Sequence, residues 1–198
     1  MPIRRRTLLS LVTLTGLSPT LGRAEDPRMT ERAVGKSDAK THVIELFSLT
    51  CTHCAAFAQL TYPEVKTKLI DTGKVHYIFH DFPLYQVALS AAMVARALPP
   101  ERYEPFISAL LASQDRWAFA PGVNSTEELW KLAALAGMSR STFDATLADT
   151  VFRDAILAQQ KADGTRWNID STPSFVINGV KHSGELDYAT FAKLIPDA

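Results

Sequence analysis

The chain has 198 residues, of which 46% are hydrophobic, and its 21 basic residues balance its 21 acidic residues. This length and composition are ordinary for one globular domain, or for one domain with a sizeable insertion. They argue against an intrinsically disordered chain and against a surface for nucleic acid.

The first 24 residues have the composition of an export signal. Three arginines at positions 4–6 precede an apolar stretch over 8–17, and the small residues Gly22 and Ala24 flank Arg23. About ten apolar residues are fewer than the ~20 that span a bilayer. We therefore expect a signal peptide that is cleaved after Ala24, and hence a periplasmic protein. The arginines resemble a twin-arginine signal, and general secretion is an equal alternative.

After a polar lead-in, two strands are expected to enclose a helix. Residues 42–48 and 74–82 are rich in β-branched and aromatic residues and are bounded by turn residues, a pattern that predicts strands. Residues 51–70 predict a helix that is kinked at Pro63, because proline has no backbone N–H. Strand, helix and strand in this order favour a βαβ unit with a parallel pair. A short edge strand is expected near 31–34.

The next block, residues 84–166, shows helical periodicity without a strand pattern. Helices are predicted near 86–98, near 101–113, from Ser125 to Gly137, from Ser139 onwards, and over 151–163 up to Gly164. The third helix begins at a capping box formed by Ser125 and Glu128, and its expected buried side includes Leu129 and Leu135. Because no flexible linker separates this block from its surroundings, we interpret it as an insertion.

The last part of the chain returns to strand signals. Residues 174–177 are followed by Asn178-Gly179, a typical hairpin turn, and by a short second arm over 180–182. A helix near 187–194 ends the pattern. These elements predict a C-terminal ββα unit.

The only two cysteines, Cys51 and Cys54, lie where the first strand passes into the helix. A helix N-terminus lowers the pKa of a thiol and thereby raises its reactivity. A disulfide across two residues closes a very short loop and removes little chain entropy, so a redox pair is favoured over a structural disulfide. A zinc site is the other alternative, but it needs about four ligands and would have to recruit histidines such as His53 or His80. We expect no metal.

These motifs resemble a known family. Cys51-Thr52-His53-Cys54 at a helix start, Thr172-Pro173 before the last hairpin, and the helical block between them are similar to the DsbA-like branch of the thioredoxin superfamily over residues 31–195. The resemblance implies an α/β thioredoxin-like fold with a helical domain inserted between a βαβ half and a ββα half. We expect the halves at 25–83 and 167–198. Thr52 departs from the proline of the best-known members and leaves the redox poise open.

The resemblance also implies roles for individual residues. Cys51 would be the nucleophile and Cys54 the resolving thiol, with His53 stabilising the Cys51 thiolate. Pro173 would follow a cis peptide bond, and the backbone of Thr172 would pair with an extended substrate.

Glu45 matches a buried acid of the family that tunes the thiol pair, with Lys74 as its partner. The strand pattern by itself leaves open a Glu45 that faces water. It does not fix the face of the strand on which the carboxylate lies.

The expected function is that of a periplasmic thiol-disulfide oxidoreductase, which donates its Cys51–Cys54 disulfide to reduced exported proteins. The family implies a membrane disulfide oxidase as reoxidant, and we expect no cofactor and a monomer. One alternative is a reductase or isomerase of periplasmic disulfides, and a lower reduction potential would be evidence for it. Another is a copper chaperone that uses the thiols as soft ligands, although no Met-rich or His-rich tract supports it.

Overall fold

The structure is a computed structural model that describes residues 26–196. The expected signal peptide lies outside these residues. A five-stranded sheet in the order β1-β3-β2-β4-β5 forms the centre of the fold. The strands are β1 (Arg32–Val34), β2 (Thr41–Phe47), β3 (Val75–Asp81), β4 (Ser174–Ile177) and β5 (Val180–Ser183).

The pairing of the strands is that of a thioredoxin-like sheet. β2 and β3 are parallel, as the βαβ pattern predicts, and all other neighbours are antiparallel. β4 lies in the interior of the sheet and all four of its residues are buried, among them the apolar residues at 175–177. β5 forms one edge of the sheet and β1 the other, so the predicted edge strand is confirmed.

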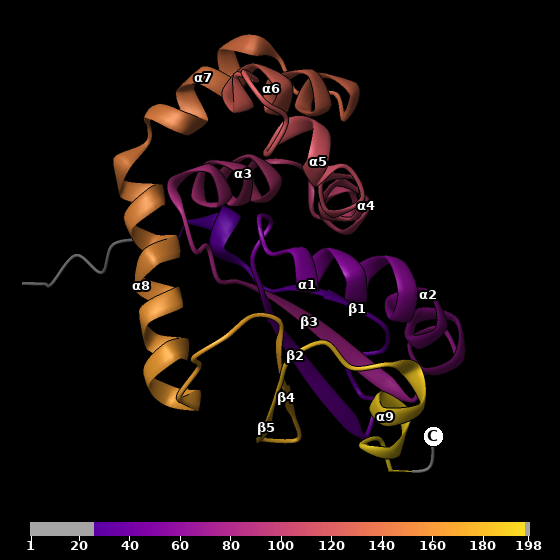
Figure 1. The fold of residues 1–198 in the computed structure, drawn as a ribbon. Coiled ribbons are helices and arrows are strands. Elements are labelled where there is room, and N and C mark those ends of the chain that lie inside the picture. Colours follow the sequence, from indigo (N-terminus) through magenta and orange to yellow (C-terminus); the bar gives the residue numbers. More distant parts are fainter. Residues whose placement is uncertain (1–25, 197–198) are drawn as a thin grey trace, which may run out of the picture.

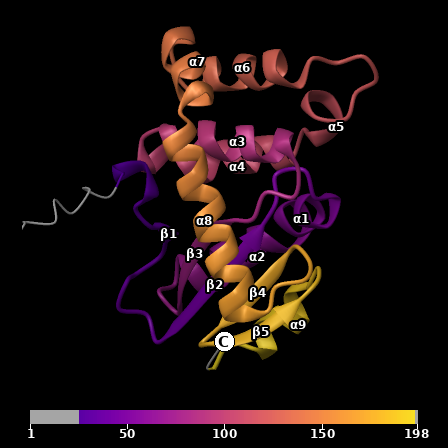
Figure 2. The same cartoon turned by 90° about the vertical axis from the view of Figure 1, so that its left-hand side faces the viewer.

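Helices cover both faces of the sheet. The chain from Thr52 to Ile70 and the C-terminal helix α9 (Tyr188–Lys193) lie on one face, and the long helix α8 (Thr150–Trp167) crosses the other (Figures 1 and 2). The remaining helices of the insertion lie beyond the end of the sheet at which β2 passes into α1 (Figure 1). They are α3 (Gln86–Ala97), α4 (Pro100–Leu111), α5 (Gln114–Trp117), α6 (Ser125–Leu135) and α7 (Arg140–Ala148). The expected fold class is confirmed.

The helical segment after β2 differs from a uniform kinked helix. It consists of α1 (Thr52–Ala56), the π-helix η2 (Phe57–Thr61), α2 (Tyr62–Val65) and a second π-helix, η3 (Lys66–Ile70). Pro63 cannot donate the hydrogen bond of an α-helical turn. The turn directly before it is therefore wide, and Tyr62 N–H bonds to the carbonyl of Phe57.

Three details of the insertion correct the sequence predictions. Asn124, and not Ser125, caps α6, since its side chain accepts the N–H groups of Thr126 and Glu127. Leu135, expected in the core, is 87% exposed. Helix α8 does not end at Gly164, which packs against Phe82, but continues to Trp167.

A buried ion pair connects the insertion to the sheet. Arg96 on α3 donates from Nε to the carboxylate of Asp81 at the end of β3, and Tyr103 on α4 donates to the other oxygen of that carboxylate over 3.1 Å. All three residues are buried. This network therefore fixes α3 and α4 beside the sheet end that carries the cysteines.

Candidate functional site

Cys51 occupies the N-cap position of α1, directly after the loop that follows β2. Its backbone is extended, and its sulfur accepts the N–H of Cys54 over 3.4 Å. Gln114 from the insertion holds this loop through its side-chain amide, which donates to the carbonyls of Leu49 and Cys51 over 2.9 and 3.0 Å. Sequence reasoning missed Gln114, because a lone glutamine in a helical block carries no motif.

The two thiols are free in the structure and differ in their environments. Cys51 keeps 9% of its surface exposed, whereas Cys54 is fully buried one helical turn further. The largest effect on the pKa of Cys51 comes from the thiol of Cys54, which hydrogen-bonds to the Cys51 sulfur and lowers this pKa. The Thr172 side chain and the backbone N–H groups of Cys54 and His53 lower it further. Together they outweigh burial, which by itself would raise the pKa, and bring it to about 5. Burial raises the pKa of Cys54. The site thus pairs a reactive thiolate with a protonated thiol.

Thr172 and Pro173 lie against Cys51. The Thr172–Pro173 peptide bond is cis, as expected, and the Cys51 thiol donates to the carbonyl of Thr172 over 3.2 Å. The hydroxyl oxygen of Thr172 is buried and has no hydrogen-bond partner among residues 26–196. It is therefore available to the Cys51 sulfur when that sulfur becomes a thiolate.

Glu45 on β2 is buried, with 4% of its surface exposed, so the water-facing alternative is wrong. The structure does not pair Lys74 with the carboxylate of Glu45, as had been expected. Lys74 is exposed directly before β3, and the carboxylate of Glu45 instead accepts a hydrogen bond from the hydroxyl of Tyr77 over 2.9 Å. Burial raises the pKa of Glu45 to about 7; the Tyr77 hydrogen bond opposes this shift, and the charge of Cys51 adds to it.

His53 lies between the cysteines on the exposed face of α1. Its side chain is 73% exposed, and its ring nitrogen Nδ1 lies 3.2 Å from the carboxylate of Glu185. Within the described part of the chain the imidazole makes no hydrogen bond to Cys51; the contribution of His53 to the thiolate comes from its backbone N–H. Glu185, in the loop after β5, has no signal in the sequence.

An apolar groove begins beside the cysteines. A cavity of about 570 Å³ lies between α1, η2 and the insertion, and Thr52, Ala55 and Leu111 line it. Two large side chains on its rim are exposed, Leu60 at 73% and Phe119 at 51%. Leu60, Leu111 and Phe119 give the groove an apolar part, whereas Gln59, Gln114 and Asp115 give it a polar part; neither cysteine lines it.

Residues 26–196 contain neither a cluster of metal-ligating side chains nor a membrane-spanning helix. No group of three or more His, Cys, Asp or Glu side chains is arranged to hold a metal ion. In the same range, no helix combines the length and the apolar character needed to cross a membrane.

Known proteins resemble this chain in sequence and in fold. A family model described as thioredoxin matches residues 28–197. The crystal structure of Wolbachia pipientis alpha-DsbA1 superposes with a TM-score of 0.78 at 32% identity, covering 84% of this chain and 89% of that one. BdbD from Bacillus subtilis, at 21% identity and a TM-score of 0.73 over 83% of this chain and 90% of its own, shares the fold.

A curated protein is also similar to this chain in sequence. A Rickettsia bellii protein named "Putative protein-disulfide oxidoreductase" is 30% identical over 152 residues, which are 76% of this chain and 58% of that protein. The chain thus spans less than two thirds of the length of the curated relatives it matches. From the family model and the Wolbachia structure together, this chain belongs to the DsbA-like branch of the thioredoxin superfamily.

Proposed function

We propose that the protein is a periplasmic thiol-disulfide oxidoreductase that donates its Cys51–Cys54 disulfide to reduced exported proteins. The observation that carries this proposal is the difference between the two thiols: Cys51, at the N-cap of α1, has a pKa lowered to about 5, and the fully buried Cys54 has a raised pKa. A stable Cys51 thiolate stabilises the reduced protein and therefore makes its disulfide a stronger oxidant. The names of the relatives support the same chemistry.

The oxidation of a substrate proceeds in two exchanges. A substrate thiolate attacks the Cys51 sulfur, the Cys51–Cys54 bond breaks, and Cys54 leaves and takes up a proton. A second substrate thiolate then attacks the substrate sulfur of the mixed disulfide, and Cys51 leaves as a thiolate. Its low pKa makes Cys51 a good leaving group, because thiols of lower pKa leave faster.

Substrate recognition would use the surfaces that meet at Cys51. The backbone of Thr172 would pair with an extended substrate segment, and the groove that contains Leu60 and Phe119 would take its apolar side chains. Two partners are proposed with this function: reduced exported proteins as substrates and a membrane disulfide oxidase as reoxidant. We propose that the protein acts as a monomer.

Export is part of the proposal and has its own test. The arginine-rich and apolar residues 1–24 support a cleaved signal peptide. Expression of the full chain in a Gram-negative bacterium, followed by osmotic shock, should release a protein whose N-terminus is Glu25. A protein that stays in the cytoplasmic fraction with an intact N-terminus would contradict the periplasmic assignment.

Trapping with cysteine variants tests the exchange mechanism. Cys51→Ser should abolish disulfide transfer to a reduced model substrate. Cys54→Ser should accumulate mixed disulfides that appear on non-reducing gels and disappear with dithiothreitol, because the resolving thiol is missing. Full transfer activity in both variants would overturn the proposal. Copper bound in a 1:1 ratio by a wild-type protein that transfers no disulfide would favour the chaperone alternative.

A further inference from the structure

The turn formed by residues 48–51, which leads into Cys51, is held from two sides. Within the turn, the N–H of Cys51 donates to the carbonyl of Ser48 over 3.1 Å. From the insertion, the side-chain amide of Gln114 on α5 donates to the carbonyls of Leu49 and Cys51 over 2.9 and 3.0 Å. The conformation of the turn therefore depends on a side chain that follows Cys51 by 63 residues.

Gln114 is itself held firmly in the insertion. It is 5% exposed, and its backbone carbonyl accepts the N–H groups of Ala118 and Phe119 over 3.0 Å each. Trp117, in the same short helix, is 1% exposed and donates from Nε1 to the carbonyl of Leu110 over 2.8 Å. The amide of Gln114 thus acts on the turn from a fixed backbone.

The carbonyls of the turn have few other partners. Among residues 26–196, Gln114 is the one hydrogen-bond partner of the Leu49 carbonyl, and Leu49 is 2% exposed. The Cys51 carbonyl also accepts the N–H of Ala55 over 3.1 Å, the first hydrogen bond of α1. A buried carbonyl without a partner is unfavourable, so loss of the Gln114 amide would shift the turn and the start of α1.

The position of the Cys51 sulfur depends on both of these segments. The sulfur accepts the N–H of Cys54 over 3.4 Å and lies 3.2 Å from the carbonyl oxygen of Thr172. Both contacts are made from the extended backbone that Cys51 has at the N-cap, with φ −89° and ψ 121°. A change in this backbone would move the sulfur away from the N–H group that stabilises its charge.

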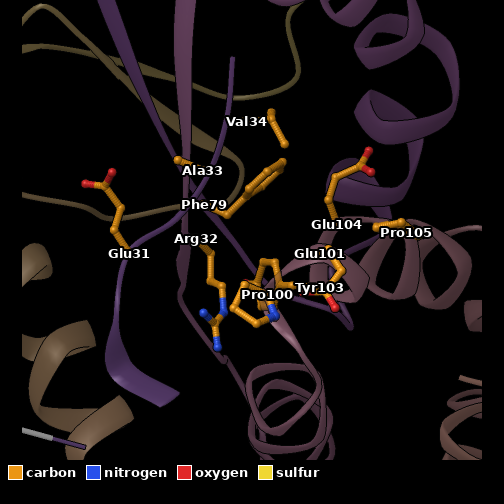
Figure 3. Close-up of a pocket in the computed structure, with 10 residues that line it drawn as sticks. All are labelled: Glu31, Arg32, Ala33, Val34, Phe79, Pro100, Glu101, Tyr103, Glu104 and Pro105. Carbon is orange, nitrogen blue, oxygen red and sulfur yellow. The ribbon is translucent and has the colours of Figure 1, made fainter. Parts of the chain in front are cut away.

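The insertion also meets the sheet away from this turn. A cavity of about 180 Å³ lies between β1 and the first turns of α4, and Arg32, Phe79 and Tyr103 are among its lining residues (Figure 3). None of the residues that line it belongs to the 48–51 turn. Contact between the insertion and the sheet therefore does not by itself reach the turn, whereas Gln114 does.

We propose that Gln114 is a positioning residue for disulfide exchange, which holds the 48–51 turn and so keeps the Cys51 sulfur where it attacks and leaves a disulfide. The inference rests on the proposed function and adds to it a role for the helical insertion. Gln114 touches no reacting atom and acts through the carbonyls of Leu49 and Cys51. Because the thiolate is charged and the disulfide is not, the reduced protein should lose more stabilisation than the oxidised protein when the amide is removed.

The test compares two glutamine-to-methionine variants. Gln114→Met keeps the length of the side chain and removes both N–H donors. Gln160→Met is the matched control, because the amide of Gln160 on α8 also donates to a loop carbonyl, that of Pro83, over 3.0 Å. The thiolate absorbance at 240 nm gives the Cys51 pKa. Equilibration with glutathione gives the constant for the reaction in which reduced protein and glutathione disulfide form oxidised protein and two glutathione thiols.

Gln114→Met should raise the Cys51 pKa by about 0.5–1 and increase this equilibrium constant by about 3- to 10-fold, which makes the disulfide a weaker oxidant. The two shifts are linked: at pH 7 Cys51 is ionised in both proteins, so a rise of one pKa unit corresponds to an about tenfold change in the constant. Gln160→Met should leave the pKa within about 0.2 and the constant within about 1.5-fold of wild type, because its amide bonds no residue of the turn.

These readouts separate positioning from packing. A side chain that only fills space would lower the Tm in both redox states and change neither the pKa nor the constant. That result for Gln114→Met overturns the inference, and so do equal shifts in Gln160→Met. If Gln114→Met does not fold, Gln114→Glu keeps the size and polarity of the side chain without its donors; it should raise the pKa at least as much, and a wild-type value would overturn the inference.

Failure of the proposed function gives a different result in the same experiment. The constant of the wild-type protein tests the proposed direction of electron flow, and a reducing wild type would refute disulfide donation. The difference between the wild type and Gln114→Met still tests the positioning role in that case.

Discussion

The sulfur of Cys51 lies 3.2 Å from the carbonyl oxygen of Thr172, which follows it by 121 residues in the chain. The antiparallel pairing of β4 with β2 brings these distant residues together, because β4 begins just after Thr172 and β2 ends just before Cys51. A substrate bound at this sulfur would therefore contact both halves of the fold.

The Thr172 hydroxyl should contribute to the low pKa of Cys51. Thr172→Val removes this hydroxyl without changing the shape of the side chain. If its hydrogen bond to the thiolate contributes about 1 kcal/mol, the Cys51 pKa should rise by about 0.7. The thiolate absorbance at 240 nm, followed as a function of pH in the reduced protein, measures this value. Thr172→Ser retains the hydroxyl and should stay close to wild type; equal values for the Val and Ser variants would contradict the assignment.

The Cys51 thiolate should make the stability of the reduced protein depend on pH. Its folded pKa of about 5 lies below the ordinary value of 9.0, so the stabilisation is complete above pH 9 and is lost as the pH falls to 5. Between pH 5 and pH 8, reduced wild type should therefore gain about 2–4 kcal/mol relative to Cys51→Ser. Urea unfolding under reducing conditions tests this. A difference that does not change with pH would refute it.

Glu45, unlike Cys51, should make the protein less stable as the pH rises. Burial raises its pKa from 4.5 to about 7, so the folded protein binds more protons than the unfolded chain between these values, and stability falls as the pH rises. Glu45→Gln keeps an acceptor for Tyr77 and removes this loss. The variant should be up to about 3 kcal/mol more stable than wild type at pH 8 and nearly equal at pH 4.5. Lys74→Ala, remote from the carboxylate, should leave both values unchanged.

The contact between the insertion and the sheet should depend on Asp81. Asp81→Asn leaves the buried guanidinium of Arg96 without its counter-charge, which costs about 3–5 kcal/mol. Thermal unfolding should show a correspondingly lower Tm. Glu64→Gln provides the control, because it disrupts the exposed pair with Lys68 and should change the stability by less than about 1 kcal/mol. Similar losses in both variants would contradict the role of the buried pair.

The sequence predicted those parts of the fold that depend on local pattern. The strands β2 and β3 were expected within one residue of their observed ends, because β-branched and aromatic content and turn residues are short-range signals. The same holds for the hairpin at Asn178-Gly179 and for the position of Cys51 at a helix N-terminus. The cis bond before Pro173 came from the family resemblance.

The sequence predictions that were wrong concern features determined by tertiary packing. Asn124 and Ser125 can each cap a helix, and only the backbone shows which one does. Leu135 fits the apolar period of α6, but its side chain points to solvent and is 87% exposed. The partner of Glu45 depends on strand register: Glu45 lies opposite Phe79, so Tyr77 two residues earlier shares its face, whereas Lys74 precedes the strand.

A redox titration of the Cys51–Cys54 pair against glutathione tests the central claim most directly. The lowered Cys51 pKa and the raised Cys54 pKa predict a disulfide that is a strong oxidant, with a reduction potential closer to about −120 mV than to about −270 mV. A value near −270 mV would contradict the proposed direction of electron flow and favour a reductase.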